Sequence, residues 1–341
     1  MKRFKIADRW IGGKSPAFIV AELSCNHRGS LSLAKELIEM AAMVDADAVK
    51  LQTDNPEGGI TINCNKSHFK VHDDWDNKYK SLYELYRETY TPWEWTDELI
   101  ETARKHGVIL FSTPSCIPGV KFLSDRDMPC YKISSFEITD IPLIEAVAAT
   151  KKPVILSDGC ADKTDLDLAI KTLRDAGNDR IAVLNCVSQY PAYGKHFNLT
   201  EIGKYEDVVP GISDHTFRND ITFAAVALGA KIVERHFTLT VRNGGPDEAF
   251  SLEPPQFREM VEGVREIEAA ISDGHAEKSH KYCKSIFVVQ DIPKGECLAG
   301  ENIGIIRPGH GIHPKEWKAV IGKIATKDLE RGEPLKDGDY E

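Results

Sequence analysis

Long apolar segments are absent from this sequence. No apolar run approaches the roughly 20 residues that a helix needs to span a bilayer. Residues 1–5 are basic, but no apolar core of a signal peptide follows them. We therefore expect a cytoplasmic protein without a membrane partner.

Excess positive charge is also missing. The 341 residues carry a formal net charge of −10 at pH 7, whereas a general nucleic-acid binder needs a basic face to neutralise phosphates. The composition therefore argues against a nucleic-acid partner. It does not argue against a small anionic substrate, because a few buried lysines set the potential inside one pocket.

Two further signatures are lacking. The eight cysteines form no CxxC pair and stand mostly in apolar or strand-end contexts, which is typical of buried thiols in a reducing compartment and not of a disulfide framework. No GxGxxG or GxxxxGK[ST] loop follows the first predicted strand. This weakens the case for a nucleotide-binding fold.

The sequence does contain a regular alternation of strand-like and helix-like segments. Eight short apolar runs are each followed by a helical segment, and the first helix begins near Ser30, with Ser30 or Ser32 as its predicted cap. The pattern predicts an α/β fold, a closed (β/α)8 TIM barrel over residues 1–272, with an open doubly wound sheet as the alternative. The predicted strands are 17–23, 47–52, 108–113, 130–134, 154–157, 181–184, 208–212 and 231–233.

Two regions depart from this alternation. Residues 54–92 form a long aromatic and charged insertion, which indicates a binding loop or lid. Residues 273–281 are polar and form a predicted linker. Residues 282–341 combine short strands and turns with one small helix near 315–320, which predicts a second, compact domain that leans on a neighbour.

Two motifs, Ser213-Asp214-His215-Thr216 and Glu234-Arg235-His236-Phe237, each place a histidine at the end of a predicted strand. A helical segment, 221–230, separates the strands, so they form a βαβ unit with parallel neighbours. Both imidazoles then lie at one end of the sheet and could hold a metal whose coordination water and substrate complete. Asp247 could add a carboxylate. The alternatives are unrelated polar strand ends and, for Asp247, a turn residue.

Polar side chains end every predicted strand, and a barrel of this type carries its chemistry at those C-terminal ends. Lys50 and Lys132 are the most informative of them, because buried lysines are rare unless they are paired or face an anion. They indicate an anion site; the alternative is an internal ion pair with Glu22 or Glu137. The other strand-end candidates are Gln52, Thr113, Ser135, Ser157, Ser188, Tyr190 and Ser213.

Taken together, these residues resemble the sialic acid synthase family. The resemblance rests on Ala21-Glu22, Asn26-His27, Lys50-Leu51-Gln52, Phe111-Ser112-Thr113-Pro114, Tyr131-Lys132-Ile133 and the two histidine motifs, in that order. Residues 307–311, Arg-Pro-Gly-His-Gly, resemble the C-terminal antifreeze-like (SAF) domain of that family. Within the family, residues 81–86, 91–95, 244–247 and 250–254 are most similar to pseudaminic acid synthases.

The resemblance implies a condensation of phosphoenolpyruvate with 2,4-diacetamido-2,4,6-trideoxy-L-altrose. A divalent metal, usually Mn²⁺ with Mg²⁺ or Co²⁺ as substitutes, would be held by His215 and His236 and polarise the sugar aldehyde. Carbon 3 of phosphoenolpyruvate attacks this aldehyde, water adds at carbon 2, and phosphate leaves by C–O cleavage.

The resemblance also assigns roles to the remaining residues. Glu22 and Glu137 would handle protons and sugar hydroxyls, beside the catalytic histidines. Phosphoenolpyruvate would be bound by Lys50, Gln52, Thr113, Lys132, Ser135, Ser157, Ser188 and Ser213. The sugar would contact Tyr190, Asp247 and Arg307. The family further implies a homodimer in which the small domain of one subunit covers the other barrel and brings Arg307 over the sugar; the alternative for Arg307 is an ordinary surface residue.

Three positions depart from the family pattern: Val187 and Asp158 each replace a usual threonine, and Arg28 replaces a usual asparagine. A carboxylate at Asp158 would repel phosphoenolpyruvate unless it points away or pairs with Arg28. The same chemistry on N-acetylmannosamine or its 2,4-diacetamido-6-deoxy analogue, giving N-acetylneuraminate or legionaminate, is one alternative function. A catalytically impaired sugar-binding protein is the other.

Overall fold

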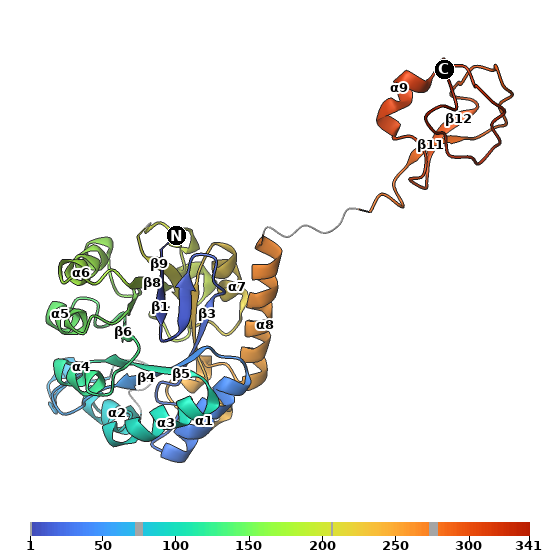
Figure 1. Ribbon diagram of the computed structural model, residues 1–341. Coiled ribbons are helices and arrows are strands. Elements are labelled where there is room, and N and C mark those ends of the chain that lie inside the picture. The colour runs from blue at the N-terminus through green and yellow to red at the C-terminus, as the bar shows by residue number, and fades with distance from the viewer. Residues whose placement is uncertain (1, 72–77, 206, 273–278) are drawn as a thin grey trace. The chain divides into compact units, whose positions relative to one another are not determined.

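The computed structural model describes residues 2–71, 78–205, 207–272 and 279–341. The chain divides into two compact units, Met1–Ser272 and Asp273–Glu341 (Figure 1). Residues 273–278, which make up most of the predicted linker, lie outside the described residues. Among those described, no helix is long and apolar enough to cross a membrane.

Eight parallel strands of the first unit close into a barrel, so the predicted TIM barrel is confirmed and the open sheet is wrong. The strands neighbour one another in the order β10-β3-β4-β5-β6-β7-β8-β9, and β10 returns to β3 with His236 opposite Glu22. Their bounds are β3 Phe18–Glu22, β4 Ala48–Thr53, β5 Ile109–Pro114, β6 Tyr131–Ile133, β7 Val154–Ser157, β8 Ile181–Cys186, β9 Val209–Ser213 and β10 Ile232–His236.

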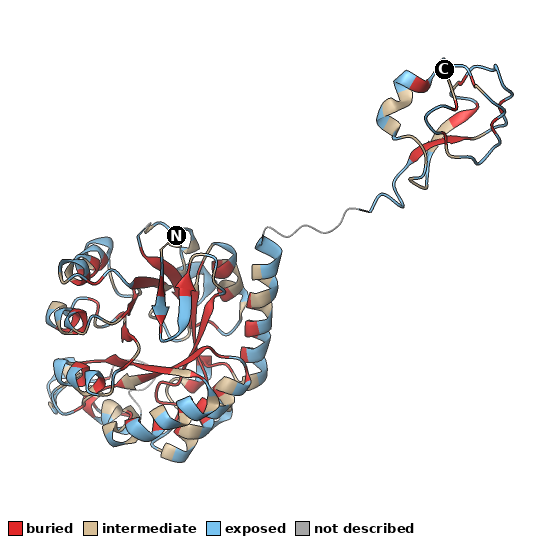
Figure 2. Ribbon diagram, viewed as in Figure 1, coloured by how far each residue is buried: buried red, intermediate tan, exposed pale blue. Residues whose placement is uncertain are grey.

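Helices surround the barrel and turn one apolar stripe toward it, so that the strands are buried and the outer helix faces are exposed (Figure 2). The predicted cap Ser30 starts the first helix, where its Oγ accepts a hydrogen bond from the backbone N–H of Leu33 at 3.3 Å. The helices are α1 Leu31–Met43, α2 Leu82–Thr89, α3 Thr96–His106, α4 Ile117–Ser124, α5 Ile141–Ala149, α6 Lys163–Asp175, α7 Asp220–Ala227 and α8 Pro254–Ile271. Short 3-10 turns are η1 Ser67–Phe69, η2 Trp93–Trp95, η3 Gly194–His196, η4 Leu199–Glu201, η5 Val241–Asn243 and η6 Glu248–Phe250.

The inward face of the barrel changes from apolar to polar along the strands. Side chains two residues apart on a strand share a face. The inner apolar cluster includes Val20, Ala48, Phe111, Cys130, Ile155, Leu184 and Ile232. Two residues further along each strand stand Glu22, Lys50, Thr113, Lys132, Ser157, Cys186 and Glu234. A layer of polar groups therefore lies on top of an apolar plug, at the C-terminal end of the barrel.

An N-terminal hairpin, β1 Arg3–Ile6 and β2 Arg9–Gly12, was not among the predicted elements. Its side chains Phe4, Ile6 and Ile11 are buried and join the inner apolar cluster, so the hairpin closes the N-terminal end of the barrel. Gly12 permits this close approach: its φ is +87°, and a Cβ there would meet the carbonyl oxygen of Lys2 at 2.4 Å. The barrel interior is thus reached from the C-terminal end.

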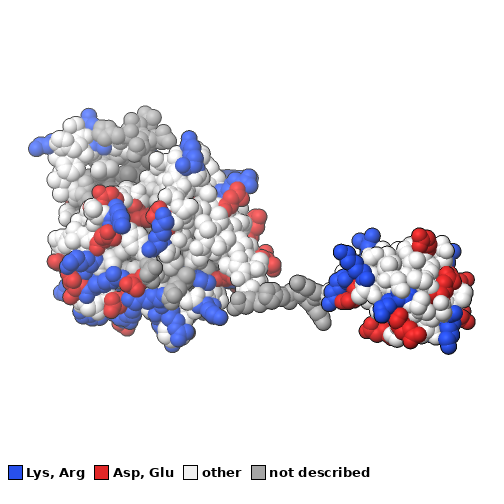
Figure 3. Space-filling model, turned by 90° about the horizontal axis from the view of Figure 1, so that it is seen from above, with Lys and Arg blue, Asp and Glu red and all other residues white. Residues whose placement is uncertain are grey.

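The second unit is built around an antiparallel pair, β11 Ser285–Val288 and β12 Ile303–Ile306. The predicted small helix is present as η7 Pro314–Glu316 followed by α9 Trp317–Val320. Nine buried apolar side chains form a core of its own, among them Ile286, Leu298 and Val320. On the face shown in Figure 3, acidic and basic side chains are interspersed on both units.

Candidate active site

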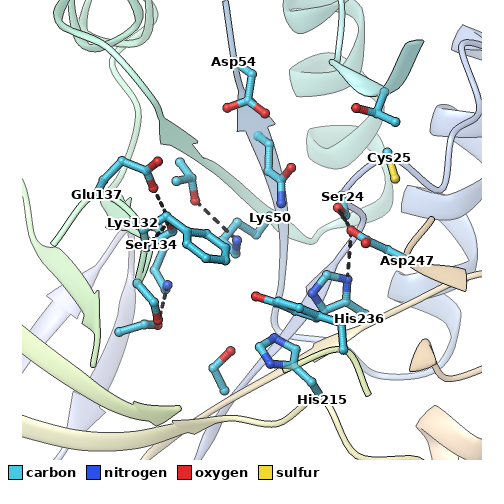
Figure 4. A pocket seen from close by; sticks show the side chains of 18 of the residues that line it. Ser24, Cys25, Lys50, Asp54, Lys132, Ser134, Glu137, His215, His236 and Asp247 are labelled. Carbon is cyan, nitrogen blue, oxygen red and sulfur yellow. Dashed lines mark hydrogen bonds and ion pairs between the residues drawn. The ribbon is translucent and has the colours of Figure 1, made fainter. Parts of the chain in front are cut away.

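A cavity of about 280 Å³ opens at the C-terminal end of the barrel; we call it the barrel cavity (Figure 4). It brings together most of the predicted site residues: Lys50, Gln52, Thr113, Lys132, Ser135, Glu137, Ser157, Tyr190, Ser213, His215, His236 and Asp247. The predicted binding insertion contributes Ile60, Leu85, Tyr86 and Thr89 to its wall. Residues far apart in the sequence thus share one polar chamber.

Two lysines and two glutamates form a buried charge cluster at the base of this cavity. Lys50 Nζ lies 2.6 Å from Glu22 Oε2 and 3.8 Å from Glu234 Oε1. Lys132 Nζ lies 3.9 Å from the same Glu234 oxygen and donates a hydrogen bond to Ser157 Oγ at 2.5 Å. The internal ion pair considered for the lysines is therefore formed by Lys50 with Glu22, yet both lysines still line the cavity.

Burial acts against charge on all four groups, and their partners oppose it to different extents. Burial raises the pKa of Glu22 to about 7 in spite of Lys50, and burial lowers the pKa of Lys132. Burial also lowers the pKa of Lys50, but Glu22 and Glu234 outweigh it and the pKa lies above its ordinary value. Burial raises the pKa of Glu234, but Lys132 and Lys50 bring it below its ordinary value. Glu234 thus faces both lysines with a lowered pKa, whereas the raised pKa of Glu22 reduces its share of negative charge near neutral pH, which favours an anionic ligand beside the lysines.

His215 and His236 lie side by side, with ring centroids 5.2 Å apart. His215 Nδ1 is 2.9 Å from the carbonyl oxygen of Val187; because a carbonyl only accepts, Nδ1 carries the proton and Nε2 keeps its lone pair. His236 Nδ1 is buried, has no hydrogen-bond partner in the described part of the chain and lies 3.7 Å from Asp247 Oδ2. Burial lowers the pKa of His215 to about 4 and that of His236 well below its ordinary value.

Two neutral imidazoles with available lone pairs fit a divalent transition-metal ion. Across residues 2–71, 78–205, 207–272 and 279–341, no group of three or more His, Cys, Asp or Glu side chains is placed to hold a metal. The histidine pair could supply two protein ligands to such an ion, which would leave coordination positions for water and substrate oxygens.

Carboxylates and an aromatic ring form the outer wall. Asp247 accepts a hydrogen bond from Ser24 Oγ, and Glu137 accepts one from Ser134 Oγ. Burial raises the pKa of both carboxyl groups. The Tyr190 ring lies 4.5 Å from that of His215, centroid to centroid. Asp247 is therefore more than a turn residue, because the fold places its side chain in the cavity wall beside His236.

Comparison with known proteins identifies the family. Residues 37–276 match the NeuB family, and residues 284–341 match the SAF domain. The chain belongs to the NeuB family. This confirms the resemblance drawn from the sequence, including the C-terminal antifreeze-like domain.

Several relatives of the chain are named synthases, and the chain is an enzyme of the NeuB family. It is 41% identical to the pseudaminic acid synthase of Helicobacter pylori over 337 residues, covering 96% of this chain and 98% of that protein. It is 38% identical to the pseudaminic acid synthase of Campylobacter jejuni over 334 residues, covering 95% and 96%. Among solved structures, an N-acetylneuraminic acid synthetase from Leptospira borgpetersenii in complex with citrate superposes with a TM-score of 0.72 at 29% identity, covering 82% of this chain and 93% of that one.

Within the first unit, two residues predicted for the NeuB-type site do not line the barrel cavity. Glu22 lies beside Lys50 on the neighbouring strand and is 1% exposed. Ser188 packs against Gly159, where a Cβ would come within 2.4 Å of Ser188 Oγ. Arg307 is an exposed residue of the second unit, and its role stays a prediction.

The departures from the NeuB pattern leave the base of the cavity intact. Asp158 was expected either to point away from the cavity or to pair with Arg28, and it points away. Its Oδ1 accepts a hydrogen bond from the backbone N–H of Cys186 at 2.8 Å, and it lines a separate small cavity. Arg28 lines yet another cavity, with Lys78. Val187 contributes its backbone carbonyl to His215, so the missing hydroxyl of this residue does not affect that contact.

Sequence reasoning missed several cavity residues, notably Glu234 and Asp54. Both stand two residues from a predicted site residue on the same strand or its extension, His236 and Gln52 respectively. The period of two along a strand was the signal that could have identified them. Ser24 likewise stands two residues after the predicted residue Glu22, whereas Tyr86, which comes from the insertion, carried no comparable signal.

Asp54 leads to a test of stability against pH. Burial raises its pKa to about 7, and Glu137 adds to the effect. Between pH 4 and 7 the folded protein keeps a proton that the unfolded chain releases, so ionisation of Asp54 destabilises the fold as the pH rises. Between pH 5 and 8, the unfolding free energy of the wild type should therefore fall by about 2 kcal/mol more than that of Asp54→Asn, as measured by urea unfolding.

The control for this measurement is Glu262→Gln, which removes an exposed carboxylate of α8. It should leave the pH dependence of the unfolding free energy as in the wild type. A parallel pH dependence of Asp54→Asn and wild type would contradict the assignment.

Proposed function

We propose that this enzyme is a pseudaminic acid synthase, which condenses phosphoenolpyruvate with 2,4-diacetamido-2,4,6-trideoxy-L-altrose and water to give pseudaminic acid and phosphate. The observation that carries the proposal is the presence of Lys50 and Lys132 in one cavity with a neutral histidine pair. The identity to two pseudaminic acid synthases over nearly the whole chain supports this choice of sugar.

The histidine pair would hold a divalent metal, which we propose to be Mn²⁺, with Mg²⁺ or Co²⁺ as substitutes. When bound, such an ion acts as a Lewis acid on the aldehyde oxygen of the sugar. Val187 supports this role, because its carbonyl keeps the His215 proton on Nδ1 and leaves Nε2 as the donor atom.

The chain's own residues would bind and orient phosphoenolpyruvate. Lys50 and Lys132 balance its phosphate and carboxylate, and the hydroxyls of Thr113 and Ser157 lie within 3.3 Å and 2.5 Å of the two ammonium groups. Carbon 3 then attacks the aldehyde carbon, water adds at carbon 2, and the C–O bond to phosphate breaks. The lysines lower the cost of the charge on the departing phosphate.

Carboxyl groups would handle the protons and the sugar. Glu137 lines the cavity, and burial raises its pKa above the ordinary value, which favours a group that accepts and returns a proton. Asp247 and Tyr190 face the histidines and would contact the sugar. Glu22 does not line the cavity, so we assign it the positioning of Lys50 in place of the predicted direct catalytic role.

We also propose the homodimer that the family resemblance implies, with Arg307 of one subunit contributing to the sugar site of the other. Mixing Arg307→Ala protein with His236→Ala protein should restore activity by forming heterodimers that contain one intact site. Two inactive proteins that stay inactive after exchange would contradict this arrangement.

Phosphate release with each of three sugars tests the function. Purified protein with Mn²⁺ and phosphoenolpyruvate should release phosphate with 2,4-diacetamido-2,4,6-trideoxy-L-altrose, and not with N-acetylmannosamine or the 2,4-diacetamido-6-deoxy analogue. Release with one of the latter instead would show N-acetylneuraminate or legionaminate synthesis, an alternative favoured by the similarity to the Leptospira synthetase. Saturable sugar binding without phosphate release would indicate a sugar-binding protein.

A further inference from the structure

We propose that Asp214 and Arg235 form a positioning pair that fixes the distance and orientation of His215 and His236 for metal binding. Each member directly precedes one of the histidines in the chain. Both side chains are 0% exposed, and Arg235 Nη1 lies 2.6 Å from Asp214 Oδ2. The inference rests on the proposed metal site.

The pair lies on the side of the strands that faces away from the barrel cavity. Ser213 and Glu234 are paired neighbours on β9 and β10, and both line the cavity. The next residues, Asp214 and Arg235, therefore turn toward the helix layer, where Thr222 of α7 donates a hydrogen bond to Asp214 Oδ2 at 2.7 Å. The histidines come next and turn back to the cavity.

The pair also holds the loop that follows His215. Asp214 Oδ1 accepts the backbone N–H of Thr216 at 2.8 Å. Arg235 Nη2 donates to the carbonyl oxygen of Thr216 at 2.6 Å, and its Nη1 donates to that of Arg218 at 3.0 Å. The residue before His236 thus fixes the backbone on both sides of His215, so the two imidazoles cannot shift independently.

Stability alone does not account for such a pair. Taking an Asp and an Arg out of water costs several kcal/mol per ion, and apolar replacements of buried pairs are often neutral or stabilising. Arg235 Nε is moreover buried and has no hydrogen-bond partner among the residues that the structure describes. The pair instead fixes orientation. A planar guanidinium donates to a carboxylate and two carbonyl oxygens at once, which the point charge of a lysine does not.

Mn²⁺ binding by calorimetry, without substrates, tests this role. We expect Arg235→Lys to keep the charge and the fold but to weaken Mn²⁺ binding about 10- to 100-fold, the usual effect of disturbing residues behind metal ligands. The matched control is Arg265→Lys. Arg265 pairs with the buried Asp47 at 3.3 Å, and Asp47 directly precedes β4, at the closed end of the barrel. This control should lose stability and keep wild-type Mn²⁺ affinity.

Thr222→Val provides a second variant should Arg235→Lys fail to fold, because it removes the hydrogen bond to Asp214 Oδ2 and the 3.5 Å contact with Arg235 Nη1 but leaves the ion pair itself. It should weaken Mn²⁺ binding in the same direction and to a smaller extent. Wild-type Mn²⁺ affinity in folded Arg235→Lys or in Thr222→Val, with only a lower melting temperature, would overturn the inference while leaving the metal site in place. Equal Mn²⁺ binding by wild type and His236→Ala would instead remove the proposed metal site, and the inference with it.

Discussion

Replacing His236 with alanine is expected to reduce phosphate release by at least about 10³-fold. The side chain is buried beside His215, and burial keeps both imidazoles neutral and able to donate a lone pair. A Lewis acid contributes several kcal/mol to the stabilisation of charge on a reacting oxygen, and each 1.4 kcal/mol or so changes the rate about tenfold. Metal content and phosphate release, measured on the same preparation, should both fall.

A third buried histidine supplies the control. His27 is 1% exposed, its Nε2 lies 3.1 Å from Thr91 Oγ1, and burial lowers its pKa to about 4. It resembles His236 in burial and charge but does not line the barrel cavity. His27→Ala should lower the melting temperature and retain bound metal. Equal activity of His236→Ala and wild type would refute the metal role of the pair.

Lys132→Met is expected to lower kcat/KM for phosphoenolpyruvate by about 10²- to 10³-fold, the range seen when one charge-stabilising donor is removed. The substitution keeps the length of the side chain but removes a cation that faces the cavity. It also leaves Glu234 with Lys50, 3.8 Å away, as its nearest cationic partner. Breaking a buried pair in this way should destabilise the fold by about 3 kcal/mol.

Adding Glu234→Gln to Lys132→Met separates the two effects. The double variant buries one charge fewer, so its unfolding free energy should recover relative to Lys132→Met. Its activity should stay low, because the cation that binds the anionic substrate is still missing. Recovery of activity together with stability would mean that Lys132 acts only by balancing Glu234.

The barrel was predictable because each of its strands can be recognised from the local sequence. Segments such as 154–157 and 181–184 are short, apolar and bounded by polar residues, and the helices between them carry local start signals such as Ser30. The N-terminal hairpin was not predictable in this way. Its three core residues are spread over a short, charged segment. They are buried only because they pack against the apolar side chains at the N-terminal end of the barrel.

The site was predictable to the extent that it follows strand ends. His215, His236, Lys50 and Lys132 stand at the ends of parallel strands, and such ends meet in a closed barrel. Which side chains contact one another could not be predicted in the same way. Glu234 between two lysines and Asp158 turned away from the cavity depend on rotamers and on the register between strands.

The sequence by itself determined the eightfold alternation, the second unit and the set of polar groups at the barrel mouth, because these follow from hydrophobic period and from the order of residues along each strand. Only the tertiary structure decided which charges meet. Ion pairs, neutral imidazoles and raised carboxyl pKa values arise when groups distant in the chain are taken out of water together. The pairing of Asp214 with Arg235, each one residue before a histidine, is of this second kind.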